Sequence, residues 1–311
     1  MIKKTLYFGN PTYLSMSNKQ MIIKLPEVEN ADVPDSFKEQ SKKSVPIEDI
    51  GVVILDNKQI TITHGLMESL LDNNVAFITC DSSRMPAGLM LPLCGHSTQT
   101  EHFRDQIEAT QPLKKQLWQQ TIKAKIKNQA LLLESTRNID ITTMLKWADD
   151  VKSGDPDNYE AQAAAYFWMN IFPDIPDFRR NREGVPPNNL LNYGYAILRA
   201  IIARAIVSSG MLPSLGIFHR NKYNPYCLAD DIMEPYRPVV DKIVIDIIAS
   251  GSDISELNFK LKQVLLSIPA QDVMMNGLHR PLLVAASHTA ASLYKCFSGK
   301  SRKIVYPDIV I

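Results

Sequence analysis

The sequence predicts an α+β fold in which a β-rich N-terminal domain over residues 1–95 precedes a larger all-α domain over residues 96–311. Up to Thr79 the apolar runs are short, rich in β-branched and aromatic residues and bounded by turn residues, which is typical of strands. After Gly95 the apolar residues recur at helical spacing along extended segments. A chain of 311 residues is long enough for two domains.

Short strands account for most of the first domain. One helix is predicted over residues 64–74, where Met67, Leu70 and Leu71 share a helix face. Residues 26–43 are polar and charged and predict a mobile loop. The predicted strands cover residues 5–8, 13–16, 21–25, 51–56, 59–63 and 75–79.

The composition indicates the cellular location of the protein more clearly than its function. The formal charge of +1 does not exclude nucleic acid, because binding depends on where basic residues cluster. The four cysteines are far apart and form no CxxC pair, which indicates thiols in a reducing compartment. The apolar run within residues 1–10 is too short for a signal peptide, so we expect a cytoplasmic protein.

The second domain opens with a helical stretch over residues 101–137, which contains no glycine and one proline. Basic residues outnumber acidic ones along it, so one side is expected to be basic. That side is either an ordinary solvated helix face or part of a binding surface, and the sequence leaves both open. The basic residues are Lys114, Lys115, Lys123, Lys125, Lys127 and Arg137.

A further helix is predicted from Asp157 onward, and it carries Glu160 on the same face as Ala163 and Phe167. A carboxylate on an apolar stripe needs a partner, because an unpaired buried charge is costly. Asp157 and Glu160 also have the spacing of a capping box, which would place Glu160 in the first turn. Spacing alone favours the cap, and the two roles are compatible.

The next helix is predicted over residues 188–209, with prolines before it and Gly210 at its C-terminal cap. It is apolar nearly all round, which predicts a central position in the helical domain. Arg199 and Arg204 interrupt it, and the uncharged stretch before Arg199 is too short to span a membrane. We therefore expect no membrane association.

A second group of basic residues flanks this helix. Arg179, Arg180 and Arg182 precede it, and Arg220 and Lys222 follow it. Guanidinium groups bind phosphate oxygens in a bidentate manner, so the set predicts a phosphate-binding groove. Each of these residues alone is more often an ordinary surface cation.

The chemistry of the chain is concentrated in residues 215–238. His219 lies in a predicted loop, and Asp231 and Glu234 have a spacing that places them on one helix face. Together with Glu160, the imidazole and carboxylates suit Mg²⁺ or Mn²⁺ better than structural Zn²⁺. A hard divalent ion beside arginines predicts phosphoryl transfer. Asp231 and Glu234 also fit a capping box at a helix start.

Three more helical segments complete the chain, over residues 238–250, 255–268 and 280–297. His279 and His288 lie in or beside them and are interpreted as packed or surface residues. Residues 301–311 form either an ordered strand or a flexible end.

The stretch from His219 to Pro238, with SLGIFH at its start and DIMEPYRP at its end, resembles the signature of the CRISPR adaptation integrase family, the first-numbered of the CRISPR-associated proteins. YEAQAAAYF resembles the glutamate-bearing helix of that family, and PPNNLLNYGYAILRAIIARAI resembles its central helix. The resemblance covers nearly the whole chain in order. The MEPYRP sequence is most similar to the branch found in type II CRISPR systems.

This resemblance implies a catalytic metal site of Glu160, His219 and Glu234, holding Mg²⁺ or Mn²⁺. Asp231 is implied as an alternative ligand or as a support for one, and Arg237 as a support for the carboxylates. In the implied reaction the 3′-hydroxyl ends of a short DNA fragment, the prespacer, are joined to the two strands of a CRISPR repeat. His219 is also a candidate to protonate the leaving oxygen. DNA contacts are expected from Asn192, Tyr193 and Lys222, besides Arg179, Arg180, Arg182 and Arg220.

The implied assembly is a homodimer formed by the N-terminal domain. Two such dimers would flank a dimer of the small second CRISPR adaptation protein, and a type II effector nuclease is a further candidate partner. Two other functions remain open on the residues alone. One is a divalent-metal DNA nuclease that acts by hydrolysis, and the other is a noncatalytic DNA-binding scaffold whose acidic residues are helix caps.

Overall fold

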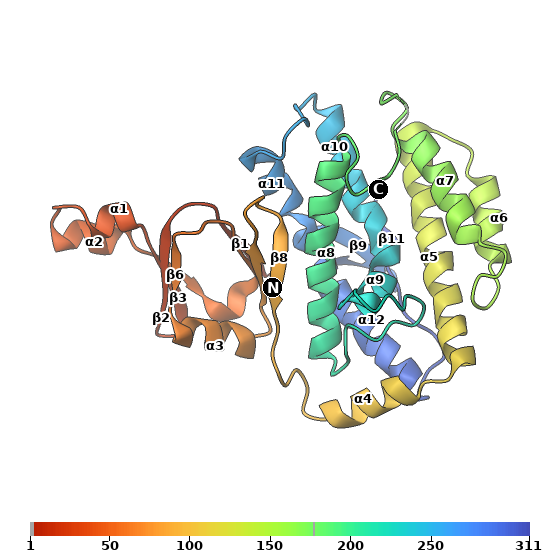
Figure 1. The fold of residues 1–311 in the computed structure, drawn as a ribbon, viewed down its shortest axis with the longest axis horizontal. Helices are drawn as coiled ribbons and strands as arrows, with labels where there is room; N and C mark the ends of the chain where they lie inside the picture. The colour runs from red at the N-terminus through yellow and green to blue at the C-terminus, as the bar shows by residue number, and fades with distance from the viewer. Residues whose placement is uncertain (1–2, 177) are drawn as a thin grey trace. The chain divides into compact units, whose positions relative to one another are not determined.

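The computed structural model describes residues 3–176 and 178–311 and divides into two compact units, Met1–Gly95 and His96–Ile311. Strands dominate the first unit and helices the second, which confirms the predicted α+β fold class (Figure 1). The division falls within the change of sequence character between residues 91 and 100.

The first unit is built on two sheets. One has the strand order β1-β5-β7-β8, in which only β8 runs antiparallel to its neighbour. The other has the order β4-β3-β2-β6, in which only the β2–β6 pair is parallel. The elements are β1 (Lys4–Phe8), β2 (Thr12–Ser17), β3 (Gln20–Lys24), β4 (Lys43–Pro46), η1 (Ile47–Asp49), β5 (Ile50–Leu55), β6 (Ile60–Ile62), α3 (His64–Asp72), β7 (Ala76–Cys80) and β8 (Pro86–Met90).

The two sheets and α3 share one hydrophobic core. Leu14 and Met21 come from the second sheet, Val53 and Phe77 from the first, and Leu66 from α3. These side chains are almost wholly buried. The alternation of apolar and polar residues along the strands is what places one set of side chains in this core.

The segment between β3 and β4 corrects one prediction, since the expected loop of residues 26–43 contains two short helices, α1 (Pro26–Glu29) and α2 (Asp35–Ser41). Neither helix buries a residue, so neither carries the apolar stripe by which helices are recognised in a sequence. Local ion pairs accompany them, including the one between Lys24 and Glu29.

The second unit is a bundle of helices with one small sheet. Its elements are α4 (Gln99–Glu108), α5 (Gln111–Arg137), α6 (Thr142–Asp150), α7 (Tyr159–Ile171), α8 (Asn188–Ser208), α9 (Cys227–Met233), η2 (Glu234–Tyr236), α10 (Arg237–Ala249), α11 (Phe259–Leu265), η3 (Ile268–Ala270), β9 (Asp272–Met275), β10 (Leu278–Pro281), α12 (Leu282–Phe297) and β11 (Asp308–Ile309).

Helix α8 is central to this unit, as predicted, and packs against α9, α10 and α12. Gly210 follows it with a φ of 74°, a left-handed conformation that glycine adopts without strain. Among the described residues, α8 is the one helix long and apolar enough to cross a membrane by length and composition. Because 78% of its most apolar window is buried, it has the surroundings of a core helix.

The stretch predicted as helical over residues 101–137 is divided into α4 and α5. The Thr110 side chain caps the new helix by accepting a hydrogen bond from the Leu113 amide, 3.4 Å away. Pro112 lies in the first turn, where a missing N–H is tolerated. Thr110 and Pro112 are therefore the start signal of α5.

The chain's last strand forms part of a sheet with the order β10-β9-β11, so the tail is ordered and the helical unit also contains strands. Asn128 of α5 connects this tail to η2. Its Nδ2 donates to the carbonyls of Pro235, at 2.8 Å, and Pro307, at 3.0 Å. Its Oδ1 accepts from the Ile309 amide at 3.1 Å.

Candidate metal centre

Glu160 and Glu234, far apart in sequence, lie on either side of one lysine side chain. Glu160 is in the first turn of α7, and Glu234 begins η2. The Lys125 Nζ atom on α5 lies 2.8 Å from Glu160 Oε1 and 2.7 Å from Glu234 Oε2. The two carboxylates predicted as metal ligands therefore share one ammonium group.

Lys125 is a buried cation, with only 9% of its side chain exposed. Burial alone would lower its pKa, but Glu234 and Glu160 outweigh burial and raise it. The lysine therefore remains charged at neutral pH and neutralises part of the negative charge of the site.

Glu234 has a second cationic partner, because Arg237 Nε donates to its Oε1 at 2.8 Å. Burial alone would raise the pKa of Glu234, but Arg237 and Lys125 lower it to about 2. Its Oε2 atom is buried and accepts no hydrogen bond of normal geometry, although Lys125 forms an ion pair with it. In the structure the cation beside this oxygen is therefore the Lys125 ammonium group.

His219 lies in the loop between α8 and α9 and is held by Asp231. The Nδ1–H group donates to Asp231 Oδ1 at 2.5 Å, and the Phe218 and His219 amides donate to the same carboxylate. The pKa of His219 is raised, chiefly by this hydrogen bond and further by the charges of Glu234 and Glu160. Because Nδ1 is engaged, Nε2 is the nitrogen left for a ligand or a proton transfer.

The His219 loop closes tightly over Asp231. A Cβ atom at Gly216 would lie 2.4 Å from the His219 carbonyl oxygen and 2.8 Å from Asp231 Oδ2, so only glycine fits there. On the other side, the Phe218 ring stacks on Trp118 of α5 with centroids 4.1 Å apart. The loop is thereby fixed against the same helix that carries Lys125.

Both capping-box interpretations of the acidic residues are wrong. Asp155, not Asp157, caps α7, because its carboxylate accepts from the Tyr159 and Glu160 amides at 2.9 Å each. Asp231 lies inside α9 and accepts from the His219 loop. The carboxylate of Glu160 is thus free of capping and faces Lys125.

The residue types fit a hard divalent ion, since two carboxylates and an imidazole nitrogen are donors that Mg²⁺ and Mn²⁺ accept. Glu234 Oε2 is buried and its neighbour is a cation, Lys125 Nζ at 2.7 Å, so this position accepts a positive charge. Within residues 3–176 and 178–311, however, no three His, Cys, Asp or Glu side chains converge closely enough to hold an ion. The glutamates are instead arranged around the Lys125 ammonium group.

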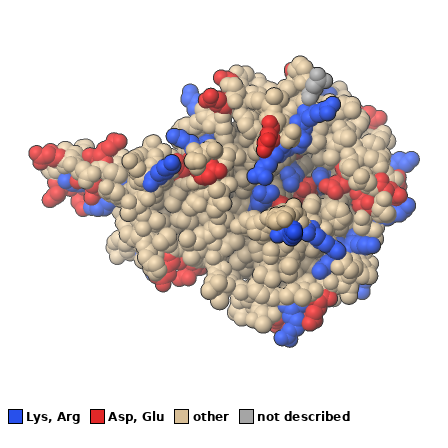
Figure 2. Space-filling view, viewed as in Figure 1, with Lys and Arg blue, Asp and Glu red and all other residues tan. Residues whose placement is uncertain are grey.

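Some of the predicted DNA contacts are exposed and one is not. Arg179, Arg182, Arg220 and Lys222 lie on the surface of the helical unit. Tyr193 is wholly buried, with Lys262 Nζ 5.2 Å from its ring centroid, so its prediction as a DNA contact is wrong. In Figure 2, Lys and Arg atoms gather on the viewed face of the larger unit, close to Asp and Glu atoms.

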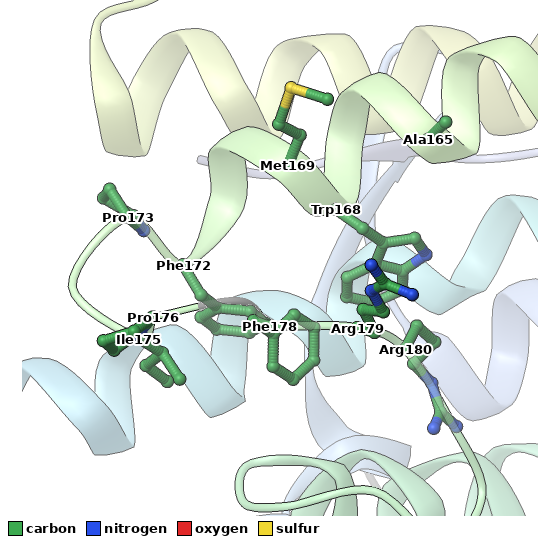
Figure 3. A pocket seen from close by; sticks show the side chains of 10 residues that line it. All are labelled: Ala165, Trp168, Met169, Phe172, Pro173, Ile175, Pro176, Phe178, Arg179 and Arg180. Carbon is green, nitrogen blue, oxygen red and sulfur yellow. The ribbon is translucent and has the colours of Figure 1, made fainter.

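Arg180 is already held in place. Its guanidinium donates to Asn188 Oδ1 and Asn192 Oδ1, at 2.8 Å each, and lies over the Tyr195 ring. With Arg179 it also borders a pocket of about 560 Å³ at the end of α7, which Trp168 lines as well (Figure 3). Asn192, predicted to position DNA, therefore orients an arginine.

A network around the Tyr195 ring supports Arg237. Its guanidinium lies 4.6 Å from the Tyr195 ring centroid, and that of Arg180 lies 5.2 Å from the same centroid. The Tyr195 hydroxyl donates to Asp241 Oδ1 at 2.5 Å. Asp241 is buried, and its pKa is raised to about 7 mainly by burial.

Lys125 is the site residue that sequence reasoning missed, because it was grouped with the basic face of its helix. The signal was its position on the apolar stripe, since Trp118, Ile122, Ile126 and Gln129 are its buried neighbours on that face. A lysine among such residues needs a buried anionic partner. Lys127, by contrast, lies on the opposite face of the helix and is exposed.

A β-rich first unit followed by a helical unit is a fold shared with solved casposase and Cas1 structures. A casposase bound to integration product aligns with a TM-score of 0.75 and 22% identity over 97% of this chain and 92% of that chain. A Cas1 protein from Thermotoga maritima aligns with a TM-score of 0.70 and 14% identity over 95% and 97% of the two chains.

The family is settled by sequence. The model of the family described as CRISPR associated protein Cas1 matches residues 7–276. The CRISPR-associated endonuclease Cas1 of Neisseria meningitidis serogroup C is 34% identical over 312 aligned positions, covering 100% of this chain and 97% of the relative. The chain belongs to the Cas1 family, which confirms the resemblance noted in its sequence.

Proposed function

We propose that this chain is a metal-dependent DNA endonuclease and integrase that joins the 3′-hydroxyl ends of prespacer DNA to a CRISPR repeat. The observation that carries the proposal is the convergence of Glu160 and Glu234 on one cationic group beside His219. The name of the Neisseria relative supports the endonuclease activity. Strand joining is supported by the likeness in fold to a casposase bound to integration product.

In this proposal Glu160, Glu234 and the Nε2 atom of His219 hold Mg²⁺ or Mn²⁺. The ion supplies Lewis-acid chemistry, lowering the pKa of an attacking hydroxyl and stabilising charge on the phosphoryl oxygens. Asp231 fixes the ring and tautomer of His219. Arg237 holds the Glu234 carboxylate in place.

The exposed cations define the expected path of the DNA. Arg179, Arg182, Arg220 and Lys222 are placed to contact phosphates, because they are exposed on the unit that carries the site. A 3′-oxygen of the DNA is the nucleophile, so the chain needs no nucleophilic serine or cysteine. Protonation of the leaving oxygen is the alternative role proposed for His219; its raised pKa favours the charged form, and in this role Nε2 carries the proton and does not bind the ion.

The family and one solved complex support part of the proposed assembly. A Cas6-RT-Cas1–Cas2 complex aligns over 99% of this chain and 36% of that chain, with a TM-score of 0.71. The name of this complex supports a Cas2 partner, and we further propose, as the sequence resemblance implies, a homodimer formed through the first unit, with two dimers flanking a dimer of the small second adaptation protein. A type II effector nuclease remains a further proposed partner, and cytoplasmic location remains expected.

Hydrolysis instead of joining is the second candidate activity, favoured by the word endonuclease in the relative's name. The two are separated by incubating the protein with its small partner, labelled DNA fragments, Mn²⁺ and a supercoiled plasmid carrying the repeat. The integrase proposal expects labelled fragments covalently joined to the plasmid. Cleaved plasmid without joined label would leave only the nuclease.

A further inference from the structure

Lys125 occupies the position that a cation shared by the two proposed glutamate ligands would take. Its Nζ atom is 2.8 Å from Glu160 Oε1 and 2.7 Å from Glu234 Oε2. Oxygen ligands lie about 2.0–2.2 Å from Mg²⁺ or a similar ion. A divalent ion bound to both oxygens would therefore overlap the ammonium group.

The two positive charges cannot share this space. Repulsion between charges grows as their separation and the local dielectric fall, and this site is enclosed, with 9% of the Lys125 side chain and 6% of the Glu234 side chain exposed. Binding of a divalent ion between the glutamates is thus an exchange in which the lysine must withdraw.

The ammonium group also has a structural role in the metal-free chain. Without a cation, Glu160 and Glu234 would repel each other, and the buried Glu234 would keep only Arg237 as a partner. The lysine side chain is long and flexible, so it can leave the site without movement of α5. Arg237 differs, because its stacking on Tyr195 holds it in place.

We propose that Lys125 is the built-in counter-cation of the site: it holds Glu160 and Glu234 together in the metal-free protein and competes with the divalent ion for them. Lys125 is thereby a positioning residue that sets the metal affinity. A neutral residue at this position leaves a site that binds metal more tightly but is less stable without it. This inference rests on the proposed metal site.

The test is calorimetric titration of the full-length protein with Mn²⁺ alone, together with thermal melting in a chelator. Lys125→Met keeps the length of the side chain and removes its charge, and its Mn²⁺ affinity is expected to rise roughly tenfold or more. In chelator it should melt below the wild type, and Mn²⁺ should raise its melting temperature by more than that of the wild type.

Two further variants control for charge and for site. Lys127→Met removes a charge from the same helix, where Lys127 pairs with Asp149 at 3.8 Å on the surface. It should change the Mn²⁺ affinity by less than about twofold, as expected for a solvent-exposed pair. Lys125→Arg retains the positive charge and should bind Mn²⁺ no more tightly than the wild type.

Several outcomes would overturn the proposal. An unchanged or weaker Mn²⁺ affinity of Lys125→Met would show that Lys125 does not compete with the ion. An equal rise in Mn²⁺ affinity in Lys125→Arg would show that the charge of Lys125 is not the cause of the competition. If Glu160→Gln and Glu234→Gln abolish Mn²⁺ binding while Lys125→Met binds like the wild type, only the role of Lys125 fails. If the wild type binds no Mn²⁺ at all, the proposed metal-dependent function fails with it.

Discussion

The carboxylate of Asp231 holds both the ring and the backbone of His219. Its Oδ1 atom accepts from His219 Nδ1 at 2.5 Å and from the His219 amide at 3.2 Å. Asp231 is fully buried, whereas 42% of the His219 side chain is exposed. A rigid buried acid therefore aims an accessible imidazole, an arrangement that fixes the orientation of metal-binding histidines.

Asp231→Asn should weaken Mn²⁺ binding about 10- to 100-fold, because the amide is neutral and holds the imidazole less firmly. Titration calorimetry measures this directly. Asp230→Asn is the matched control, since the adjacent Asp230 pairs with Arg199 and does not touch His219. Equal losses in the two variants would contradict a specific role for Asp231.

Glu160→Gln and Glu234→Gln should both abolish DNA joining, but they should differ in stability. Loss of the Glu234 charge leaves the buried Lys125 and the partly buried Arg237 short of a partner and should cost about 3 kcal/mol of unfolding free energy. Glu160 is more exposed, at 24% of its side chain, and its loss should cost about 1 kcal/mol. Denaturant unfolding measures both values, and a larger loss for Glu160→Gln would contradict the described burial.

The buried Asp241 should make stability depend on pH. Its pKa is raised to about 7 from 3.8, so folding favours the protonated form. The associated stability is present in full below about pH 4 and is lost as the pH rises through about 7. The asparagine side chain in Asp241→Asn does not titrate. The melting temperature of this variant, relative to that of the wild type, should therefore rise between pH 4 and 7.5.

Asp246→Asn provides the comparison for that experiment, because Asp246 lies on the same helix and pairs with Lys242 at the surface. A pH-independent difference between the wild type and Asp241→Asn would show that the buried carboxyl does not titrate in this range.

The exposed arginines should bind DNA mainly through charge. Arg179→Ala and Arg182→Ala should weaken binding of unrelated sequences to a similar extent, and each should reduce the slope of log K against log salt by roughly one. Fluorescence anisotropy at several salt concentrations measures this slope. Tyr193→Phe should leave DNA affinity unchanged, because Tyr193 is buried. Unchanged slopes in both arginine variants would place the DNA elsewhere.

Local patterns in the sequence were enough to predict six of the eight described strands of the first unit, without β4 and β8, and most helices of the second. The strands alternate in burial, and helices such as α8 and α12 carry continuous apolar faces. Helices α1 and α2 were missed because they bury nothing. In the small sheet, the hairpin of β9 and β10 was overlooked although its turn, Asn276-Gly277, is a local hairpin signal. Its pairing with residues 308–309 is a long-range contact that no local pattern encodes.

The site was predictable in part for the same reason. Glu160, His219 and Glu234 were recognised from motifs, and the structure places Glu160 and Glu234 around one cation. The partner that joins them, Lys125, lies on another helix and carries no motif. Tyr193 was misjudged because helix α8 is apolar nearly all round, so periodicity does not show which of its polar residues face outward.

The contacts of Asn128 have a consequence for the order in which the protein is made. The turn that begins with Glu234 is tied through Asn128 to the Pro307 carbonyl and the Ile309 amide. A chain still emerging from the ribosome lacks these last partners, so the carboxylate of Glu234 lacks its full support until synthesis reaches them. A nascent chain should therefore not offer a finished site to chromosomal DNA.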